Sequence, residues 1–312
     1  MSKISIIGAG EVGASCASSL AERDFVNEIV ILDVKQGVAE GKALDLRQSA
    51  AIKRFDTNVI GVTNDYDSIR ESDVVVITSG ITRKPGMDRN DLIATNASIM
   101  RDVCRKIALY SPDSKIIVVS NPLDVLCYCA LVSSGFTHNR VMGMSGMLDV
   151  ARYKYFIAEE LNVSPKDIQA LILGGHGTTM VPMPRYTTIG GIPIRQLLDE
   201  SQVQAAIKKT QFGGEEIIKH LGRSGWYAAG GAICEMVEAV VCNQHRVFPV
   251  CAYLRGEYGY NDIYLGVPVI LGSNGIEKVI ELELDEDDKQ RFDISQKEVR
   301  TNLETLKKMI LN

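Results

Sequence analysis

Short apolar runs recur along the first half of the chain. They are rich in β-branched residues and nearly continuous rather than alternating, and they occupy residues 4–7, 29–32, 74–77, 116–119 and 141–144. Such runs are typical of strands that are buried on both faces of a parallel sheet. Segments with helical spacing lie between most of them, at residues 11–22, 37–49 and 89–110. The alternation predicts an α/β fold with a Rossmann-type, doubly wound parallel sheet over residues 1–145.

The organisation changes after residue 145, and a mixed α+β catalytic domain is predicted over residues 146–312. Its expected helices are residues 145–161, a mostly apolar segment at 226–241 that should be buried all round, and a charged amphipathic segment at 294–311. A strand at 167–173 should lead into Gly174-Gly-His-Gly177, and residues 264–271 and 276–284 should form a hairpin around Ser273-Asn-Gly275. The chain has no long Gly/Ser linker, so we expect the two domains to pack closely.

Composition and charge narrow the classes of function. The 312 residues carry 34 Lys and Arg against 39 Asp and Glu, a net charge of −5, which argues against general binding of nucleic acid. No secretory signal and no bilayer-spanning apolar run is evident, so the cytoplasm is the expected compartment and no membrane partner is expected. The seven cysteines, an odd number without a CxxC pair, should be buried free thiols, and no metal site is expected.

A glycine-rich turn follows the first predicted strand. Gly8-Ala9-Gly10-Glu11-Val12-Gly13 opens a helix, and Asp33 ends the next strand, 20 residues beyond Gly13. Glycines here permit a tight turn and close approach to a pyrophosphate, while a carboxylate at Asp33 suits a ribose hydroxyl. Asp33 would repel a 2′-phosphate and so favours NAD over NADP, although nearby Lys35 weakens that preference. The alternative is a tight βα turn that binds no ligand.

His176 is the strongest candidate for acid/base chemistry, since it stands between glycines just after a predicted strand. A neutral imidazole suits proton exchange with an alcohol or carbonyl oxygen. Asp149 and Arg152 share one helix face, where Asp149 could hold His176 in one tautomer and Arg152 could bind a carboxylate. The alternatives are a structural histidine and an ordinary surface ion pair. The other histidines, His138, His220 and His245, are expected to have no chemical role.

Positive charge is concentrated at residues 81–91, ITRKPGMDRND. Arg83, Lys84 and Arg89 crowd around a Pro-Gly pair in an otherwise acidic chain. Taken alone, the segment is a solvated loop, and Lys84 is expected to be no more than that. A site for an anion is the alternative.

Six motifs together resemble the lactate/malate dehydrogenase family, over essentially the whole chain. They are GAGEVG, ILD, GITRKPGMDR, VVSNPLDV, SGMLDVAR and GGHG, in family order and at family spacing. Within that family the chain resembles the malate-specific members of the lactate-dehydrogenase-like type. The resemblance implies an NAD-dependent oxidoreductase that interconverts malate and oxaloacetate. It also implies a homo-oligomer, a tetramer or a dimer, since the family forms both.

The resemblance implies a role for each matching residue. Residues 8–13 and Asp33 would bind NAD, with Asn96, Val119, Ser120 and Asn121 at the nicotinamide half. Asp149 would orient His176, the proton acceptor in malate oxidation. The substrate would be bound by Asn121, by Arg152 at the carboxylate next to the reacting carbon, by Arg89 at the carbonyl oxygen and by Arg83 at the second carboxylate.

Arg83 distinguishes between substrates. A closed site needs a cation for each carboxylate, because an unpaired buried charge costs several kcal/mol. Lactate-specific relatives carry Gln where this chain has Arg83, so binding of a monoanion would leave the guanidinium unpaired. The alternatives are a lactate or other 2-hydroxyacid dehydrogenase, an NAD-using glycosidase (for which a metal-ligating Cys/His pair is lacking) and a non-catalytic NAD-binding module.

Overall fold

The computed structural model describes residues 2–82 and 88–310; for Arg89 and Ile310 it describes only the backbone. Nine strands of these residues form one continuous sheet. The order across the sheet is β14-β13-β12-β6-β5-β4-β1-β2-β3. The bounds of these strands are β1 Lys3–Ile7, β2 Glu28–Asp33, β3 Asn58–Thr63, β4 Val74–Ile77, β5 Lys115–Val118, β6 Val141–Gly143, β12 Arg246–Arg255, β13 Asn261–Gly272 and β14 Gly275–Val279.

Six of the strands confirm the predicted doubly wound sheet. Strands β1 to β6 are parallel and lie in the order 3-2-1-4-5-6, the order of a Rossmann fold. Apart from those of the edge strand β3, their side chains are almost all buried, as the continuous apolar runs predicted. The carboxyl ends of β1, β2, β4 and β5 therefore meet along one edge, where such sheets bind ligands.

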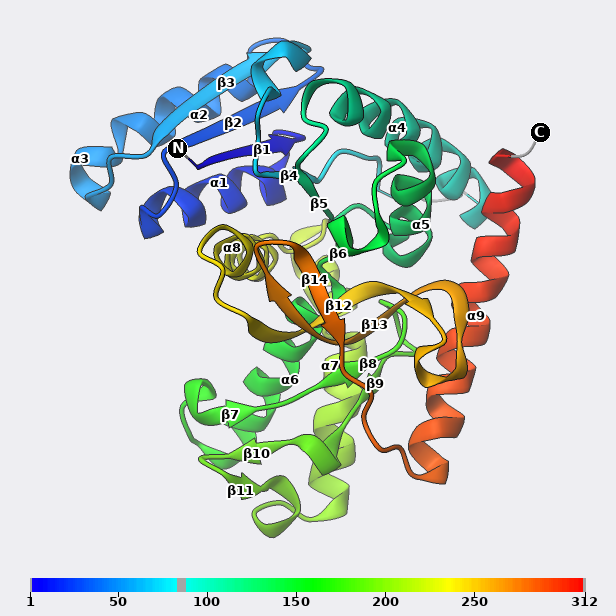
Figure 1. The fold of residues 1–312 in the computed structure, drawn as a ribbon. Helices are drawn as coiled ribbons and strands as arrows, with labels where there is room; N and C mark the ends of the chain where they lie inside the picture. Colours follow the sequence, from blue (N-terminus) through cyan, green and yellow to red (C-terminus); the bar gives the residue numbers. More distant parts are fainter. Residues whose placement is uncertain (1, 83–87, 311–312) are drawn as a thin grey trace.

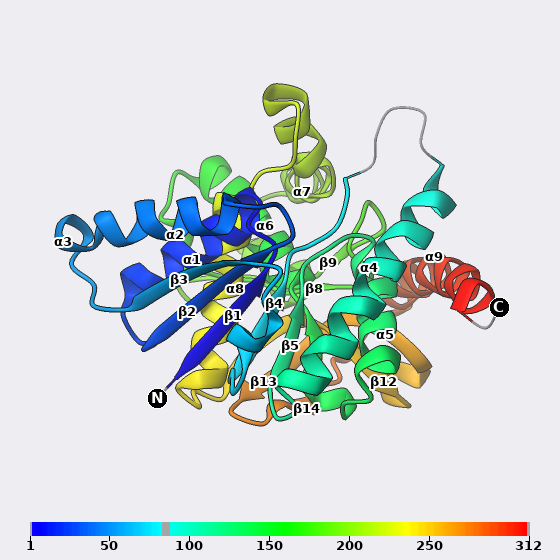
Figure 2. The same cartoon turned by 90° about the horizontal axis from the view of Figure 1, so that it is seen from above.

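Helices cover both faces of the sheet (Figures 1 and 2). Helix α1 packs against α8 on one face, and α4 packs against α5 on the other, with α9 beyond them. Helix α6 packs against α7 in the second half of the chain. The bounds are α1 Glu11–Arg23, α2 Val38–Gln48, α3 Ala50–Lys53, α4 Arg89–Tyr110, α5 Leu123–Ser134, α6 Ser145–Leu161, α7 Glu200–Leu221, α8 Tyr227–Val241 and α9 Glu286–Ile310.

The antiparallel strands of the second half extend the parallel sheet of the first. Strand β12 pairs with β6 at Cys251 and Gly143, and with β13 along nearly its whole length. The predicted hairpin is confirmed as β13 and β14, and Gly275 at its turn has φ +87°. The fold class is thus confirmed. The division of the chain into residues 1–145 and 146–312 stays a prediction.

Two short sheets accompany the main one, and one of them flanks the loop around His176. Strands β8 (Ile172–Leu173) and β9 (Val181–Pro182) flank that loop and pair with each other. The other sheet holds β7 (Ile168–Gln169), β10 (Thr188–Ile189) and β11 (Ile192–Pro193). The single strand predicted at 167–173 is therefore wrong: its two ends pair in different sheets, and residues 170 and 171 belong to neither.

Other elements differ from the predicted bounds. Helix α9 begins at Glu286 rather than at residue 294, because Asp285 accepts the backbone N–H of Asp288 at 2.8 Å and so caps a first turn rich in acid. Strand β14 ends at Val279 rather than at residue 284. Helix α8 is at least partly buried from Ala229 onward, as predicted, but its first two residues, Tyr227 and Ala228, are exposed. The patterns did not single out β3, α5, α7 or β12.

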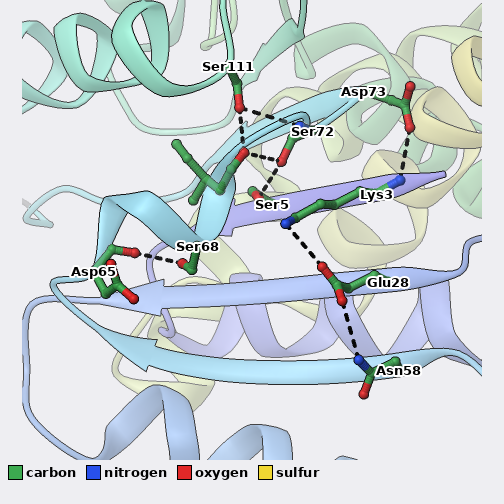
Figure 3. Close-up of polar contacts among 10 residues, drawn as sticks. Lys3, Ser5, Glu28, Asn58, Asp65, Ser68, Ser72, Asp73 and Ser111 are labelled. Carbon is green, nitrogen blue, oxygen red and sulfur yellow. Dashed lines mark hydrogen bonds and ion pairs between the residues drawn. The ribbon is translucent and has the colours of Figure 1, made fainter. Parts of the chain in front are cut away.

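Buried serines connect the first strands to the helical layer (Figure 3). The hydroxyls of Ser5 and Ser72 are 2.7 Å apart, and Ser111 hydrogen-bonds the backbone of Ser72 and of Ile69. All three serines are almost fully buried, and their hydroxyls are satisfied within the cluster. The hydrogen bonds of this cluster therefore connect β1, the start of β4 and the end of α4.

The thiols follow the prediction with one exception. All seven cysteines are free, and six are buried; Cys242, just after α8, is exposed. None of the helices formed by the described residues is both long and apolar enough to cross a membrane.

Candidate active site

The glycine-rich turn between β1 and α1 has the geometry of a dinucleotide-binding turn. Gly8 has φ +116°, which favours glycine, and a Cβ on Gly13 would fall on the carbonyl oxygen of Gly8. Gly10 faces open space and caps α1 without a side-chain hydrogen bond. The first backbone N–H groups of a 13-residue helix therefore point to a position that an anion can approach.

Asp33 at the end of β2 lies against the same turn. Its Oδ2 accepts the backbone N–H of Ala9 at 2.6 Å, and its Oδ1 accepts that of Lys35 at 2.9 Å. These bonds fix the carboxylate at the carboxyl edge of the sheet, where it retains lone pairs for a ribose hydroxyl. The turn and the carboxylate, 20 residues apart in sequence, are thus joined by a direct hydrogen bond.

Asp149 joins the two other groups of the proposed catalytic set. Its Oδ2 lies 2.8 Å from Nδ1 of His176, and its Oδ1 lies 3.3 Å from Nη1 of Arg152. Asp149 is 1% exposed, whereas His176 is only partly buried. A buried carboxylate that accepts from Nδ1–H leaves Nε2 of the imidazole free to accept a proton.

The surroundings of His176 favour its protonated form. Burial lowers the pKa of the imidazole, and so does the positive charge of Arg152. The negative charge and the hydrogen bond of Asp149, together with the negative charge of Asp124, raise this pKa by more. The pKa of His176 is therefore raised above its ordinary value of 6.5. A base with a raised pKa holds an abstracted proton more firmly.

Arg152 borders an open cavity of ≈ 840 Å³ between α6, α7 and α8. Its guanidinium lies close to Gly214, and a Cβ there would be 3.4 Å from Nη2. The Nε of Arg152 is buried and meets no acceptor among the described residues. That donor and the forked geometry of arginine suit a carboxylate ligand. His220, at the end of α7, lines the same cavity.

The residues predicted for the nicotinamide half meet at the end of β5. Asn96 of α4 is 2% exposed, and its Oδ1 accepts the backbone N–H of Ile81 at 2.8 Å. Its Nδ2 donates to the carbonyl of Ile81 at 3.0 Å and to the carbonyl of Asn121 at 2.7 Å. Ser120 donates to the carbonyl of Ser79 at 2.5 Å. Val119 is partly buried and the side chain of Asn121 is exposed. Asn96 thus fixes the backbone of Asn121.

Two predicted substrate residues cannot be located by their side chains. Arg83 lies outside the described residues, as do Lys84 to Met87. Arg89 is the first residue of α4, and only its backbone is described. Their assignments stay predictions.

Sequence reasoning missed Asp124, which stands next to the site. This residue lies in the first turn of α5 and is 7% exposed, and its Oδ2 accepts the backbone N–H of His176 at 3.0 Å. It belongs to the motif VVSNPLDV, but an acidic residue in a first turn is ordinary and its burial leaves no mark in the sequence. Through Asp124 the histidine loop of the second half meets the carboxyl end of β5.

The remaining histidines lie apart from this arrangement. His138 is in a short 3-10 turn, His138–Arg140, and His245 pairs with Glu277 at 2.8 Å. Among the described residues, no group of three or more His, Cys, Asp or Glu side chains is arranged to hold a metal ion.

A Rossmann-type sheet that presents a dinucleotide turn, joined to a second half that presents a His–Asp pair, defines a dehydrogenase of the nicotinamide-dependent class. The chain belongs to the lactate/malate dehydrogenase family: residues 2–143 match the family's NAD binding domain, and residues 146–310 match its alpha/beta C-terminal domain.

Individual relatives cover almost the whole chain. A malate dehydrogenase of Cytophaga hutchinsonii is 55% identical over 97% of both chains. The structure of malate dehydrogenase from Salinibacter ruber is 49% identical over 98% of both chains, with a TM-score of 0.94. The TM-score is also 0.94 for a lactate dehydrogenase of Cryptosporidium parvum in complex with lactic acid and nicotinamide adenine dinucleotide, 34% identical over 98% of both chains. Backbone shape therefore does not distinguish the two substrates.

Proposed function

We propose that this protein catalyses the reversible NAD-dependent oxidation of (S)-malate to oxaloacetate. The observation that carries the proposal is the buried carboxylate of Asp149, which contacts both His176 and Arg152. One residue thereby orients an acid/base group and a carboxylate-binding group toward the same substrate. Membership of the lactate/malate dehydrogenase family supports this interpretation.

The N-terminal half would hold NAD, which accepts a hydride at its nicotinamide ring when bound. Residues Gly8, Ala9, Gly10, Glu11, Val12 and Gly13 would bind the pyrophosphate and Asp33 the adenosine ribose. Asn96, Val119, Ser120 and Asn121 would line the nicotinamide half. The open space at Gly10 and the uncapped start of α1 support this fit.

His176 and Arg152 would act directly on the substrate. Nε2 of His176 would accept the hydroxyl proton of malate as the hydride leaves the carbon that bears this hydroxyl, and it would return the proton to the carbonyl oxygen of oxaloacetate in the reverse reaction. Asp149 keeps the other proton on Nδ1 and stabilises the imidazolium. Arg152 binds the carboxylate beside the reacting carbon, and Asn121 hydrogen-bonds the substrate.

The choice of a dicarboxylate rests on Arg83, with Arg89 at the carbonyl oxygen. Both roles come from the sequence resemblance. Malate and oxaloacetate carry two carboxylates, so Arg83 and Arg152 would give each carboxylate a cation. Lactate or another 2-hydroxyacid is the alternative substrate. Because the chain is also similar to a lactate dehydrogenase, the experiment below includes this alternative.

Oxidation of NADH followed by absorbance tests the proposal directly. Oxaloacetate, pyruvate and a longer 2-oxoacid are compared by kcat/KM with the full-length protein. We expect a preference for oxaloacetate of about a hundredfold or more, which corresponds to a differential of about 3 kcal/mol. A preference for pyruvate would refute the assignment of malate, and inactivity with every acceptor would favour a non-catalytic NAD-binding module.

The Arg83→Gln variant tests the specificity residue. We expect kcat/KM for oxaloacetate to fall by about a hundredfold and that for pyruvate to change little, because only oxaloacetate carries the second carboxylate. The matched control is Arg54→Gln on the exposed end of α3, which should alter neither substrate. Equal losses on both substrates would show that Arg83 does not bind the second carboxylate.

The remaining expectations belong to the same proposal. The protein would act in the cytoplasm on a small dicarboxylate, without nucleic-acid or membrane partners, and would form a homotetramer or a dimer. Light scattering of the purified protein would give the number of subunits.

A further inference from the structure

The loop that carries His176 is held on two sides by residues from distant parts of the chain. Asp124, in the first turn of α5, accepts the backbone N–H of His176 at 3.0 Å. Ser295, in α9, accepts the backbone N–H of Gly175 at 2.9 Å with its Oγ. Helices α5 and α9 pack against each other (Figure 1). The loop therefore runs between two helices that are already in contact.

The packing around the two glycines of the loop is tight. A Cβ on Gly174 would be 2.5 Å from Oγ of Ser295, and a Cβ on Gly175 would be 2.5 Å from Cγ2 of Val299. Gly174 also exchanges two backbone hydrogen bonds of 2.9 Å with Gly266 of β13. The backbone before His176 is thus fixed by the main sheet, by α9 and by α5.

Both supporting side chains are buried, and Asp124 can in addition make charge-assisted hydrogen bonds. Ser295 is 0% exposed and Asp124 is 7% exposed. The second oxygen of Asp124, Oδ1, accepts from the thiol of Cys251 at 3.1 Å, so each oxygen of the carboxyl group has a donor. Charge-assisted bonds in a site of low dielectric are stronger than bonds between neutral groups.

Asp124 is also a second carboxylate beside the imidazole. The titratable and charged groups that face this pair come from four elements: Asp149 and Arg152 of α6, Cys251 of β12, Cys127 of α5 and Glu298 of α9. The charge of Asp124 raises the pKa of His176, as that of Asp149 does. Asp149 acts on the ring through a direct hydrogen bond, whereas Asp124 acts from the backbone side.

We propose that Asp124 and Ser295 are positioning residues for hydride transfer: together they fix the backbone of the His176 loop, and the carboxylate of Asp124 stabilises the positive charge that His176 acquires. The inference rests on the proposed function, in which His176 exchanges a proton with the substrate. Neither residue need touch substrate or cofactor. Their effect is on where Nε2 lies and how firmly it holds a proton.

The test compares Asp124→Asn and Ser295→Ala with two matched controls. Asp24→Asn removes a carboxylate that accepts backbone N–H groups of Asp56 and Thr57 in the first half of the chain. Ser111→Ala removes a buried hydroxyl that accepts the backbone N–H of Ser72. For each full-length variant kcat, KM, the Kd of NADH, the melting temperature and the pH profile of malate oxidation are measured.

We expect kcat to fall by about 10- to 100-fold in Asp124→Asn and Ser295→Ala, because a small displacement of a reacting group has a large effect on rate. The Kd of NADH should stay within about twofold in both, since the cofactor turn is untouched. In Asp124→Asn the acid limb of malate oxidation should move to lower pH, because one stabilising charge is lost. Ser295→Ala should not move that limb, and the controls should change only the melting temperature.

Three results would overturn the inference. They are a kcat at the wild-type level in Ser295→Ala, a loss of kcat that merely follows the melting temperature as in the controls, and an unshifted acid limb in Asp124→Asn. If Asp124→Asn does not fold, Ser295→Ala tests the positioning of the loop, and Asp124→Ser, read by the same shift of the acid limb, tests the effect of the charge.

Failure of the proposed function can be told apart from failure of this inference. If the wild-type protein prefers another 2-oxoacid, the same variants are assayed with that acceptor. If it turns over none, the His176 ring protons are titrated by NMR, assigned by comparison with His176→Ala. A lower pKa of His176 in Asp124→Asn then supports the inference, and an unchanged pKa overturns it.

Discussion

At the scale of single residues, the site depends on how two carboxylates surround one imidazole. Asp149 bonds the Nδ1 side of the ring, and Asp124 bonds the backbone N–H of the same residue. Burial opposes protonation of His176, yet the net effect raises its pKa. The histidine is thereby suited to take a proton from an alcohol and to return it to a carbonyl.

The direction of that shift predicts opposite pH profiles for the two reactions. Malate oxidation needs neutral His176, so kcat/KM for malate should fall as the pH decreases through a pKa above 6.5. Oxaloacetate reduction needs protonated His176, so its kcat/KM should fall as the pH rises through the same value. Initial rates in both directions check this, and profiles that fall on the same side would contradict it.

Removal of the imidazole should separate chemistry from cofactor binding. In His176→Ala we expect kcat to fall by about 10²- to 10⁴-fold, the usual contribution of a positioned acid/base group. The Kd of NADH, measured by fluorescence titration, should change by less than about twofold because His176 lies in the other half of the chain. His138→Ala is the control and should retain full activity. A parallel loss of NADH affinity would refute the role of His176.

At the scale of elements, the β1–α1 turn shows how two glycines of one motif serve different purposes. Gly13 is needed for packing, because a Cβ would meet Gly8 and would also come 3.0 Å from Oγ1 of Thr78. Gly10 has open space around its Cα, so it is needed only if a ligand approaches. The two positions can be tested separately.

Gly13→Ala should lower the free energy of unfolding by about 1–3 kcal/mol, as overpacking does, and NAD affinity with it. Gly10→Ala should have a smaller effect on unfolding but should also weaken NAD binding, because the added methyl group occupies the approach of the pyrophosphate. Thermal unfolding and NADH titration of both variants measure this. Unchanged affinity in Gly10→Ala would argue against pyrophosphate binding at this turn.

Sequence patterns predicted the elements that are buried along a regular apolar face or run. They missed the elements that lack such a pattern. The buried parallel strands and α6 were evident because their apolar spacing is local. The start of α9 was missed because its first turn is acidic and held by a cap, not by an apolar face. Helix α5 is apolar nearly all round, so it lacks the stripe by which amphipathic helices are found.

The same distinction applies to the site. The cofactor turn, Asp33, Asp149, Arg152 and His176 belong to short motifs, and the structure brings the last three together. Asp124 and Ser295 approach the loop from 52 and 120 residues away in sequence, and although Asp124 stands in the motif VVSNPLDV, nothing in the sequence shows that either residue contacts the loop. Only the fold reveals that contact.

At the scale of the whole molecule, the two halves share one sheet and pack helices against each other on both of its faces. Strand β12 continues the parallel sheet beside β6, and α8 of the second half packs on α1 of the first. Arg23 of α1 pairs with Glu235 and Glu238 of α8, and Gly230 lies so close to Ser15 that a Cβ there would clash. Such an extensive interface predicts that the halves unfold together.

The single tryptophan, Trp226, reports on this coupling, since it directly precedes α8. We expect its fluorescence and the far-ultraviolet circular dichroism to give one coincident thermal transition. The proposed site of NAD is in the first half. NAD at a hundred times its Kd should add about 2.7 kcal/mol to the free energy of unfolding, and it should therefore raise the midpoint temperature of both signals. Two separate transitions, or a shift in only one signal, would show that the halves unfold independently.

The position of Ser295 near the end of the chain links the chemistry to the order of synthesis. Ser295 follows Gly175 by 120 residues, and a ribosome adds about 5–20 residues per second. For several seconds, therefore, a nascent chain contains the residues of the cofactor turn and of the histidine loop but lacks the hydroxyl that hydrogen-bonds the loop. Because the halves share one sheet and are expected to unfold together, competence for turnover is acquired only as the last helix is made.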